Sequence, residues 1–201
     1  MDLIFQIAIL IVSIIIHEVA HGYMAKALGD NTAEWQGRLT LNPLKHIDPF
    51  GSIFLPLLTY ISGGFILGWA KPVPYNPYNL RPGRFSEALV ALAGPGVNLF
   101  IACIFGLILQ LGGVEPLSAF EYMLKSIIWV NIVLSLFNLV PIPPLDGSKI
   151  LFALLPARLA WVKDFLERYG FVLLIVFIFF LWQSVLPVVF ALFHLISGLS
   201  L

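Results

Sequence analysis

Long apolar segments dominate the sequence and restrict what the chain can fold into. They cover residues 3–27, 51–69, 88–112, 120–140 and 170–196, and a shorter apolar piece covers 150–156. Since about 20 apolar residues in a helix cross a bilayer, hydropathy predicts four or five spans. Apolar residues make up 60% of the 201-residue chain and charged residues only 11%. We therefore expect an all-α, polytopic membrane protein.

Charge, cysteine content and the first apolar segment narrow what kind of protein this is. Eleven basic and eleven acidic side chains give a formal net charge of zero, so we expect no nucleic-acid partner. The single cysteine, Cys103, lies in an apolar run and can form no internal disulfide. The first apolar segment lacks preceding basic residues and a following cleavage motif, so we expect a retained helix rather than a removable signal peptide.

Two polar stretches separate the first three long apolar segments. Residues 28–50 hold several Gly, Asn, Asp and Pro turn residues, and the piece EWQGRLTLNP within them is predicted to form a short strand. Residues 70–87 contain KPVPYNPYNLRPGRFSE, which predicts an extended loop.

The segment 51–69 is predicted to dip into the membrane and return without crossing it. A proline at 56 and paired glycines at 63 and 64 disfavour a regular helix. A re-entrant path also collects almost all basic residues on one side, which is the cytoplasmic side by the positive-inside rule, with Lys125 alone near the other face. The residues collected are Lys26, Arg38, Lys45, Lys71, Arg81, Arg84, Lys149, Arg158, Lys163 and Arg168.

The stretch IIIHEVAHGY places two histidines and a glutamate in the first apolar segment. His17 and His21 are four residues apart, so on a helix they lie on one face, one turn apart. With Glu18 beside them they have the H-E-x-x-H spacing by which zinc peptidases hold two imidazoles and a general base. The alternative is a pair of structural core histidines, which the high cost of unpaired polar groups in hydrocarbon disfavours.

A catalytic zinc ion needs a third protein ligand and an open position. Asp146, in FNLVPIPPLDGSKIL, is the best candidate because three prolines just before it exclude a regular helix and let its side chain turn inward. Its alternative role is that of a helix N-cap, and both roles can coexist. At 1.5 Å per residue, His21 lies about 30 Å along the first helix. Two crossings, 88–112 and 120–140, would return Asp146 to that same side.

Four motifs, in this order, extend the pattern: HEVAHGYMAKALGD, GRLTLNPLKHIDPFGS, ALAGPGVNLFIA and FNLVPIPPLDGSKIL. Together they resemble the site-2 protease family of intramembrane zinc metalloproteases, in its short form without PDZ or CBS domains. The resemblance covers most of residues 10–156. It implies that His17, His21 and Asp146 bind Zn²⁺ and that Glu18 is the general base.

The same resemblance suggests roles for other parts of the chain. It implies that residues 31–46 contribute a membrane-dipping strand that presents substrate along its edge, at residues 37–41. It also implies that Asn138 helps to hold substrate near the metal; the alternative for Asn138 is a hydrogen bond that ends its helix. Asn98 is interpreted as a packing or substrate-channel residue. His46 and His194 have no partner at metal-ligand spacing and are interpreted as structural.

The expected function is that of an intramembrane zinc endopeptidase that cleaves transmembrane segments of membrane proteins near the cytoplasmic side. The protein is expected to be an integral, multi-pass protein of the cell (plasma or inner) membrane. Residues 1–201 are expected to form one domain, with a core at 1–156 and a C-terminal loop and helix at 157–201. The alternative is a non-proteolytic zinc-binding carrier or scaffold, for which a base such as Glu18 would be unnecessary.

Overall fold

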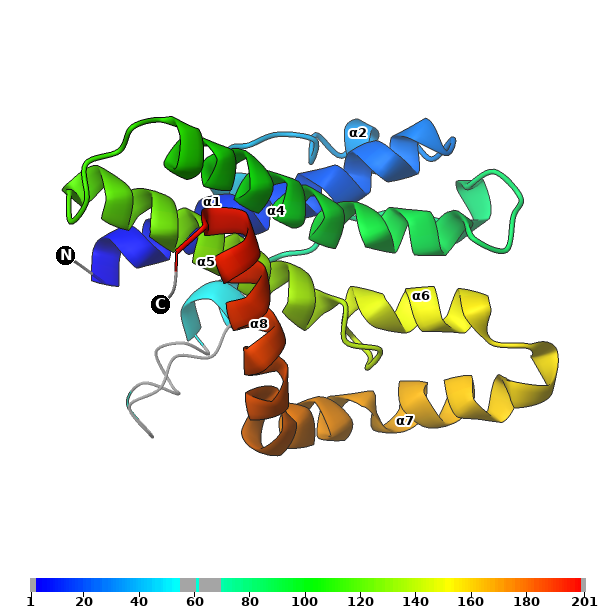
Figure 1. Cartoon of the computed structure of the whole chain (residues 1–201). Coiled ribbons are helices and arrows are strands. Elements are labelled where there is room, and N and C mark those ends of the chain that lie inside the picture. The colour runs from blue at the N-terminus through cyan, green and yellow to red at the C-terminus, as the bar shows by residue number, and fades with distance from the viewer. Residues whose placement is uncertain (1–2, 55–60, 62–69, 200–201) are drawn as a thin grey trace.

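Helices and the turns and loops that join them make up the part of the chain that the computed structural model describes, which is residues 3–54, 61 and 70–199 (Figure 1). Three long helices form its frame: α1 (Leu3–Ala27), α4 (Ser86–Leu111) and α5 (Ala119–Asn138). Figure 1 shows α4 alongside α1, and α5 packs against both. Each helix agrees with a predicted apolar segment to within two residues at either end.

Four helical stretches of the described chain are long and apolar enough to cross a membrane. They are Ile4–Ala27, Ser86–Leu111, Ala119–Asn138 and Ala157–Ser197. A helix of 20 residues is about 30 Å long, which matches the hydrocarbon core of a bilayer. The predicted all-α fold is therefore confirmed, and these four stretches are the candidate membrane spans.

The fourth stretch is divided between two helices. It follows α6 (Asp146–Leu154) and consists of a short turn η4 (Ala157–Leu159), the helix α7 (Ala160–Val176), a π-helical turn η5 (Phe177–Leu181) and the helix α8 (Trp182–Ser197). In Figure 1, α7 runs beside α6 and α8 then turns away steeply toward α5. The predicted span 170–196 is therefore interrupted, as π-helical turns commonly interrupt a helix.

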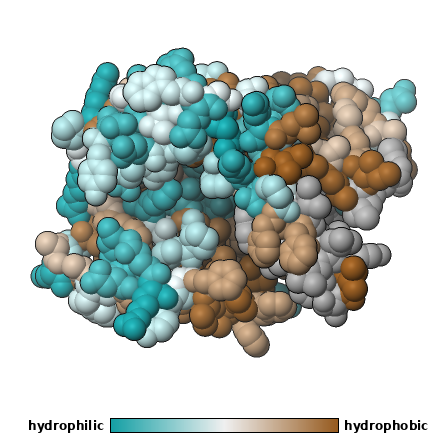
Figure 2. Space-filling model, turned by 180° about the vertical axis from the view of Figure 1, so that it is seen from behind, coloured by the Kyte–Doolittle hydropathy of each residue, from teal (hydrophilic) through white to brown (hydrophobic). Residues whose placement is uncertain are grey.

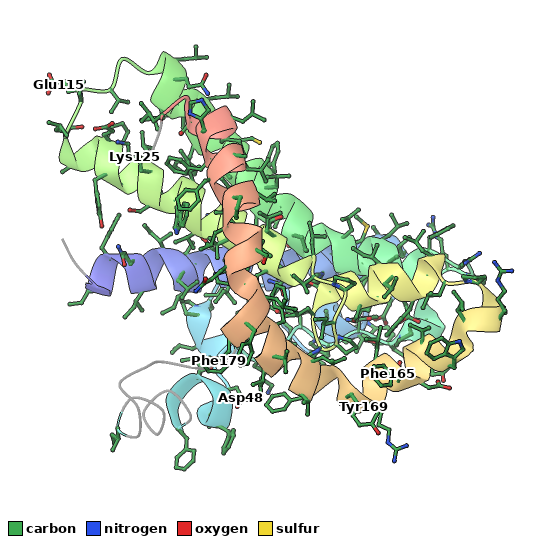
Figure 3. All side chains as sticks on the ribbon, turned by 60° about the horizontal axis from the view of Figure 1, so that its bottom comes forward. Asp48, Glu115, Lys125, Phe165, Tyr169 and Phe179 are labelled. Atoms are coloured by element: carbon green, nitrogen blue, oxygen red, sulfur yellow. The ribbon has the colours of Figure 1, made fainter. Side chains whose placement is uncertain are left out.

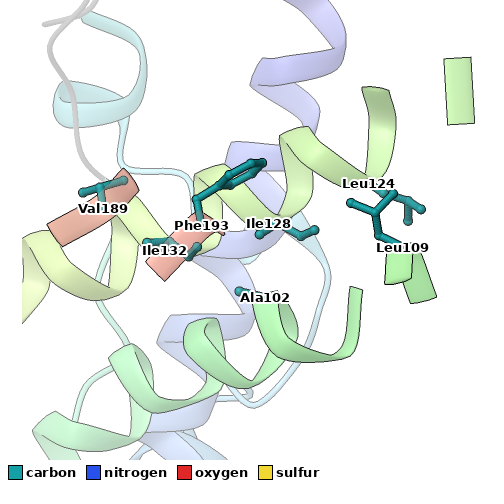
Figure 4. Close-up of a cluster of buried hydrophobic side chains, with 7 residues drawn as sticks. All are labelled: Ala102, Leu109, Leu124, Ile128, Ile132, Val189 and Phe193. Atoms are coloured by element: carbon teal, nitrogen blue, oxygen red, sulfur yellow. The ribbon is translucent and has the colours of Figure 1, made fainter. Parts of the chain in front are cut away.

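The largest apolar cluster lies where α4, α5 and α8 meet (Figure 4). Lipid tails are as apolar as these side chains, so close packing rather than exclusion from water holds such helices together. The cluster joins the C-terminal helix to the frame. Its buried members are Ala102, Leu109, Leu124, Ile128, Ile132, Val189 and Phe193.

Gly106 lets α8 approach α4 closely. A Cβ atom at Gly106 would clash with the backbone and side chain of Ile196. Next to this contact, the side-chain amide of Gln110 donates a 2.8 Å hydrogen bond to the carbonyl of Ile196. Small residues at helix crossings commonly have this role in membranes, so the position of α8 depends on a glycine in α4.

The predicted strand in residues 31–46 is wrong. These residues form a four-residue helix, α2 (Thr32–Trp35), a turn through Gly37 at φ +60°, and a 3-10 turn, η1 (Pro43–Lys45). Side-chain hydrogen bonds favour turns here: Asp30 accepts from Thr32, and Asn42 accepts from the N–H of Leu44. Such local bonds compete with strand pairing, and the described residues contain no second strand to pair with.

Most of the segment 51–69 lies outside the described residues, so its predicted re-entrant path stays a prediction. A π-helical turn, η2 (Pro49–Phe54), leads into it.

Polar and apolar surface separate along the molecule. Figure 2 shows hydrophilic residues gathered toward one end and hydrophobic ones toward the other. The polar end holds the loops after α1, the loop before α4 and the turn between α6 and α7. Lys125 lies at the opposite end, near Glu115 in the turn between α4 and α5 (Figure 3). This distribution agrees with the predicted isolation of Lys125 from the other basic residues.

Candidate metal centre

Helix α1 brings His17 and His21 together. Their rings lie edge to face, with centroids 4.6 Å apart, and their Nε2 atoms are 3.0 Å apart. Both side chains are buried, at 6% and 8% exposure. The spacing of four residues places them on one helical face, as expected.

Asp146 reaches the two histidines from a distant part of the chain. Its Oδ2 atom is 3.1 Å from the Nε2 atom of His17 and 3.1 Å from that of His21. Asp146 is the first residue of α6, and the N-cap position is taken by Leu145. The alternative role of Asp146 as an N-cap is therefore not observed.

The turn before α6 aims the Asp146 carboxylate inward. The backbone N–H and the hydroxyl of Ser148 both donate to the carbonyl of Leu145, at 3.1 and 2.7 Å, which closes the first turn of the helix. At Gly147, any Cβ would clash with the backbone of Leu139. The glycine after Asp146 therefore lets this turn pack against the end of α5.

The hydrogen-bond partners of the two Nδ1 atoms determine which ring nitrogen carries the hydrogen in His17 and His21. Nδ1 of His17 lies 2.6 Å from Oδ1 of Asn98, and Nδ1 of His21 lies 2.7 Å from the carbonyl of Val90. Both partners can only accept, so each Nδ1 must carry the hydrogen. In the neutral rings, each Nε2 then presents a lone pair toward the other and toward the Asp146 carboxylate.

Three electron-rich atoms in such close contact repel one another unless a cation lies between them. Two imidazole nitrogens and a carboxylate oxygen are a usual donor set for catalytic zinc. Tetrahedral zinc with bonds of about 2.0–2.1 Å holds its ligand atoms about 3.3 Å apart, and the observed separations are 3.0–3.1 Å. Within the described residues these side chains form the one group of this kind, and they fit zinc in both type and spacing.

Gly94 in α4 contributes to the same centre and was missed in the sequence. A Cβ atom at Gly94 would lie 2.5 Å from the Nε2 atoms of both His17 and His21. The space beside the two nitrogens therefore exists because residue 94 has no side chain. The motif ALAGPGVNLFIA contains this glycine, but only the position of α4 beside α1 reveals its contact.

Glu18 is half-buried and is held by a segment far away in the sequence. Its Oε2 atom accepts a 2.8 Å hydrogen bond from the backbone N–H of Val73. Val73 lies in an extended segment, residues 70–76, which we call the strap. The strap lies close against α1 at Gly22, where a Cβ would meet the Val73 side chain at 2.8 Å.

Both ends of the strap are tied down. Nη2 of the buried Arg38 donates to the carbonyls of Lys71 and Pro72, at 2.9 and 3.2 Å. At the other end, Asp30 accepts from the N–H of Asn76 at 2.7 Å. Burial raises the pKa of Asp30, but hydrogen bonds from Thr32, Asn79 and Asn76 outweigh burial and lower that pKa from its ordinary value.

Of the other residues considered in the sequence, only Asn98 is described in contact with a histidine of the centre. Asn98 contacts His17 directly, as described above. Asn138, the last residue of α5, donates from Nδ2 to the carbonyl of Leu134 at 3.0 Å within its own helix. His46 lies near the carbonyl of Thr40, with Nε2 2.8 Å away. Neither His46 nor His194 joins the described metal-ligand group.

Comparisons with known proteins agree with this geometry. The sequence model of peptidase family M50 matches residues 5–128 and 114–181. The chain is 45% identical over 174 residues to "Putative zinc metalloprotease YwhC" of Bacillus subtilis (strain 168), which covers 83% of this chain and 76% of that relative. No solved structure matches the chain significantly.

More distant relatives match the chain over shorter regions. It is 34% identical over 138 residues to "Putative zinc metalloprotease Rip2" of Mycolicibacterium smegmatis, with 68% of this chain and 52% of the relative covered. It is 30% identical over 98 residues to "Putative zinc metalloprotease MJ0611" of Methanocaldococcus jannaschii, with 44% and 50% covered. The matched regions span about half of these two relatives.

The family match runs across α1, α4 and α5 and includes all three clustered side chains. It therefore confirms the resemblance seen in the motifs: the chain belongs to peptidase family M50, the site-2 protease family, and is a membrane metalloprotease.

Proposed function

We propose that the protein is an intramembrane zinc endopeptidase that cleaves transmembrane segments of membrane proteins near the cytoplasmic side. The observation that carries the proposal is the convergence of His17, His21 and Asp146 within 3.1 Å of one another, with Glu18 beside them in α1. The cofactor is Zn²⁺, as family membership and the names of the relatives indicate. In this proposal the three clustered side chains are its ligands.

Glu18 is proposed as the general base. Zinc, when bound in such a site, acts as a Lewis acid and makes water acidic near neutral pH. Glu18 takes the proton from the attacking water and passes it to the amine that leaves when the peptide bond breaks. The hydrogen bond from Val73 holds one carboxylate oxygen of Glu18, so the other oxygen remains for the proton transfer.

A transmembrane substrate must unwind before it is cut. Its peptide carbonyls are otherwise held in intrahelical hydrogen bonds, and a helix offers no free carbonyl for attack. We propose that water enters through the polar loops 28–50 and 70–87, which lie at the hydrophilic end of the molecule (Figure 2). In this proposal Asn138 assists in holding the opened substrate.

The described residues on either side of 51–69 support a re-entrant path for that segment. The N–H of Arg81, before α4, donates a 2.7 Å hydrogen bond to the carbonyl of Leu28, after α1. The chain therefore leaves α1 and enters α4 at the same end of the molecule. A single crossing between them would separate Leu28 and Arg81 by the thickness of the membrane. With the positive-inside rule, this end is proposed to face the cytoplasm.

The decisive experiment compares the wild-type protein with Glu18→Gln in proteoliposomes that contain a single-span substrate protein. Glu18→Gln should bind zinc as tightly as the wild type and lose cleavage, because the amide cannot accept the proton. Glu87→Gln, which changes an exposed glutamate at the start of α4, is the matched control and should cleave normally. Cleavage retained in Glu18→Gln would contradict the proposed base. Zinc bound by a wild type that cleaves no membrane substrate would instead favour a carrier or scaffold.

A further inference from the structure

A chain of buried polar side chains leads away from His17 into the core. Asn98 in α4 and Asn131 in α5 are fully buried, and Ser13 in α1 is 4% exposed. Nδ2 of Asn98 donates to Oδ1 of Asn131 at 2.7 Å and, over a longer 3.4 Å contact, to the carbonyl of Ser13. Nδ2 of Asn131 in turn donates to the hydroxyl of Ser13 at 3.0 Å and to the carbonyl of Ile127 at 2.9 Å.

The carbonyl of Ile127, which can only accept, determines which group donates in each amide contact of this chain. The carbonyl of Ile127 cannot donate, so the Asn131 amide must turn its NH₂ group toward it and its oxygen toward Asn98. That oxygen in turn requires the NH₂ group of Asn98. Only the Asn98 oxygen is then left to face His17, 2.6 Å from Nδ1.

We propose that Asn131, with Ser13, is a positioning residue that prevents the Asn98 amide from rotating. The inference rests on the proposed metal function of His17. An unrestrained amide can present either its oxygen or its NH₂ group, which have nearly the same shape. With the NH₂ group toward Nδ1, His17 would carry its hydrogen on Nε2, the atom that faces His21 and Asp146, and could not bind a metal there. The contacts of Asn131 and Ser13 with Asn98 therefore keep His17 in the tautomer that binds zinc.

The residues of this hydrogen-bonded chain come from three different helices. Ser13 lies one turn before His17 in α1, while Asn98 and Asn131 come from α4 and α5. The same polar contacts that set the tautomer therefore also hold the frame helices together. A test must distinguish a purely structural role of Asn131 from its proposed role toward His17. Replacing the Asn98 amide by a carboxylate makes this distinction possible.

A carboxylate at position 98 does not need to be held in one orientation, because both of its oxygens can accept from Nδ1 of His17. If Asn131 acts only through the orientation of Asn98, its loss should matter for an amide at 98 and not for a carboxylate. If Asn131 only stabilises the fold, its loss should weaken zinc binding equally in both cases.

The test measures zinc affinity of the purified full chain in detergent by competition with a chromophoric chelator. Asn131→Leu should bind zinc about tenfold more weakly than the wild type, at the lower end of the effect of losing an outer partner of a metal ligand. Asn98→Asp/Asn131→Leu should regain an affinity close to that of the wild type. Gln110→Leu removes another interhelical amide contact of α4 and is the control, with unchanged affinity. If Asn131→Leu does not fold, Asn131→Ala is compared in the same way.

Two results would overturn the inference. One is wild-type zinc affinity in Asn131→Leu, and the other is a double variant that binds zinc as weakly as Asn131→Leu alone. Failure of the proposed function gives a different result, because the wild-type protein itself would then bind no zinc.

Discussion

Val73 and Glu18 are joined across 55 positions of sequence by a hydrogen bond of 2.8 Å, in which the Val73 backbone N–H donates to Oε2 of Glu18. The proposed base is thus oriented by the main chain of the strap. Val73 itself is 5% exposed, so water cannot readily replace the N–H donor. A backbone donor of this kind fixes where the carboxylate lies.

Removing this donor should slow catalysis without affecting the metal. Val73→Pro lacks the N–H, and proline suits an extended segment that already has prolines at 72 and 74. A hydrogen bond to a charged group contributes about 1.5–3 kcal/mol, so we expect kcat to fall roughly ten- to hundredfold. KM and zinc affinity should stay unchanged in the same assays. Val73→Ala keeps the N–H and serves as the control; an equal loss of kcat in both variants would contradict this role.

Gly94 provides a second test, of the space around the proposed metal. Gly94→Ala should greatly reduce zinc binding, because its Cβ would lie 2.5 Å from both Nε2 atoms, well inside van der Waals contact. Gly96→Ala is a matched control two residues later in α4, where a Cβ meets no atom within 4 Å. Zinc content measured by atomic absorption on the purified proteins separates the two. Full zinc occupancy in Gly94→Ala would show that the metal lies elsewhere.

Much of the frame could be predicted because it depends on local pattern. Apolar segment lengths give α1, α4 and α5, and the spacing of His17 and His21 places them on one helical face. The proline-rich break before Asp146 correctly marked a place where a side chain could turn inward. These features need no knowledge of which segments meet in space.

The parts that could not be predicted are contacts between distant segments. Gly94, Asn131 and Val73 resemble ordinary glycine, helix and loop residues in the sequence, and only the packing of α4, α5 and the strap against α1 gives them a role. The strand predicted in residues 31–46 failed for a different, local reason. The piece EWQGRLTLNP was predicted to form a short strand, but local side-chain hydrogen bonds favoured turns and no partner strand lies in the described residues.

Asp30 should make the stability of the loop region depend on pH. Its pKa is lowered in the folded protein, so its stabilising effect is present above the unfolded pKa of about 3.9 and is lost as the pH falls through the folded value. Asp30→Asn should therefore lower the melting temperature at pH 7, and the difference from the wild type should shrink below about pH 4. Asp164→Asn, at an exposed position in α7, makes the same charge change and should have little effect. A difference for Asp30→Asn that does not vary with pH would contradict the assignment.

Removal of zinc should destabilise the protein through the three clustered side chains. The Nε2 atoms of His17 and His21 and the Oδ2 atom of Asp146 lie 3.0–3.1 Å apart, and a cation between them offsets the repulsion of their lone pairs. Free zinc at 100 times its Kd stabilises the folded state by about 2.7 kcal/mol, which corresponds to roughly 5–10 °C in melting temperature for a chain of this size. Differential scanning fluorimetry in detergent, with and without a chelator, measures the shift. His21→Ala removes a ligand and should abolish the shift, whereas His194→Ala should retain it. An unchanged shift in His21→Ala would place the stabilising zinc at another site.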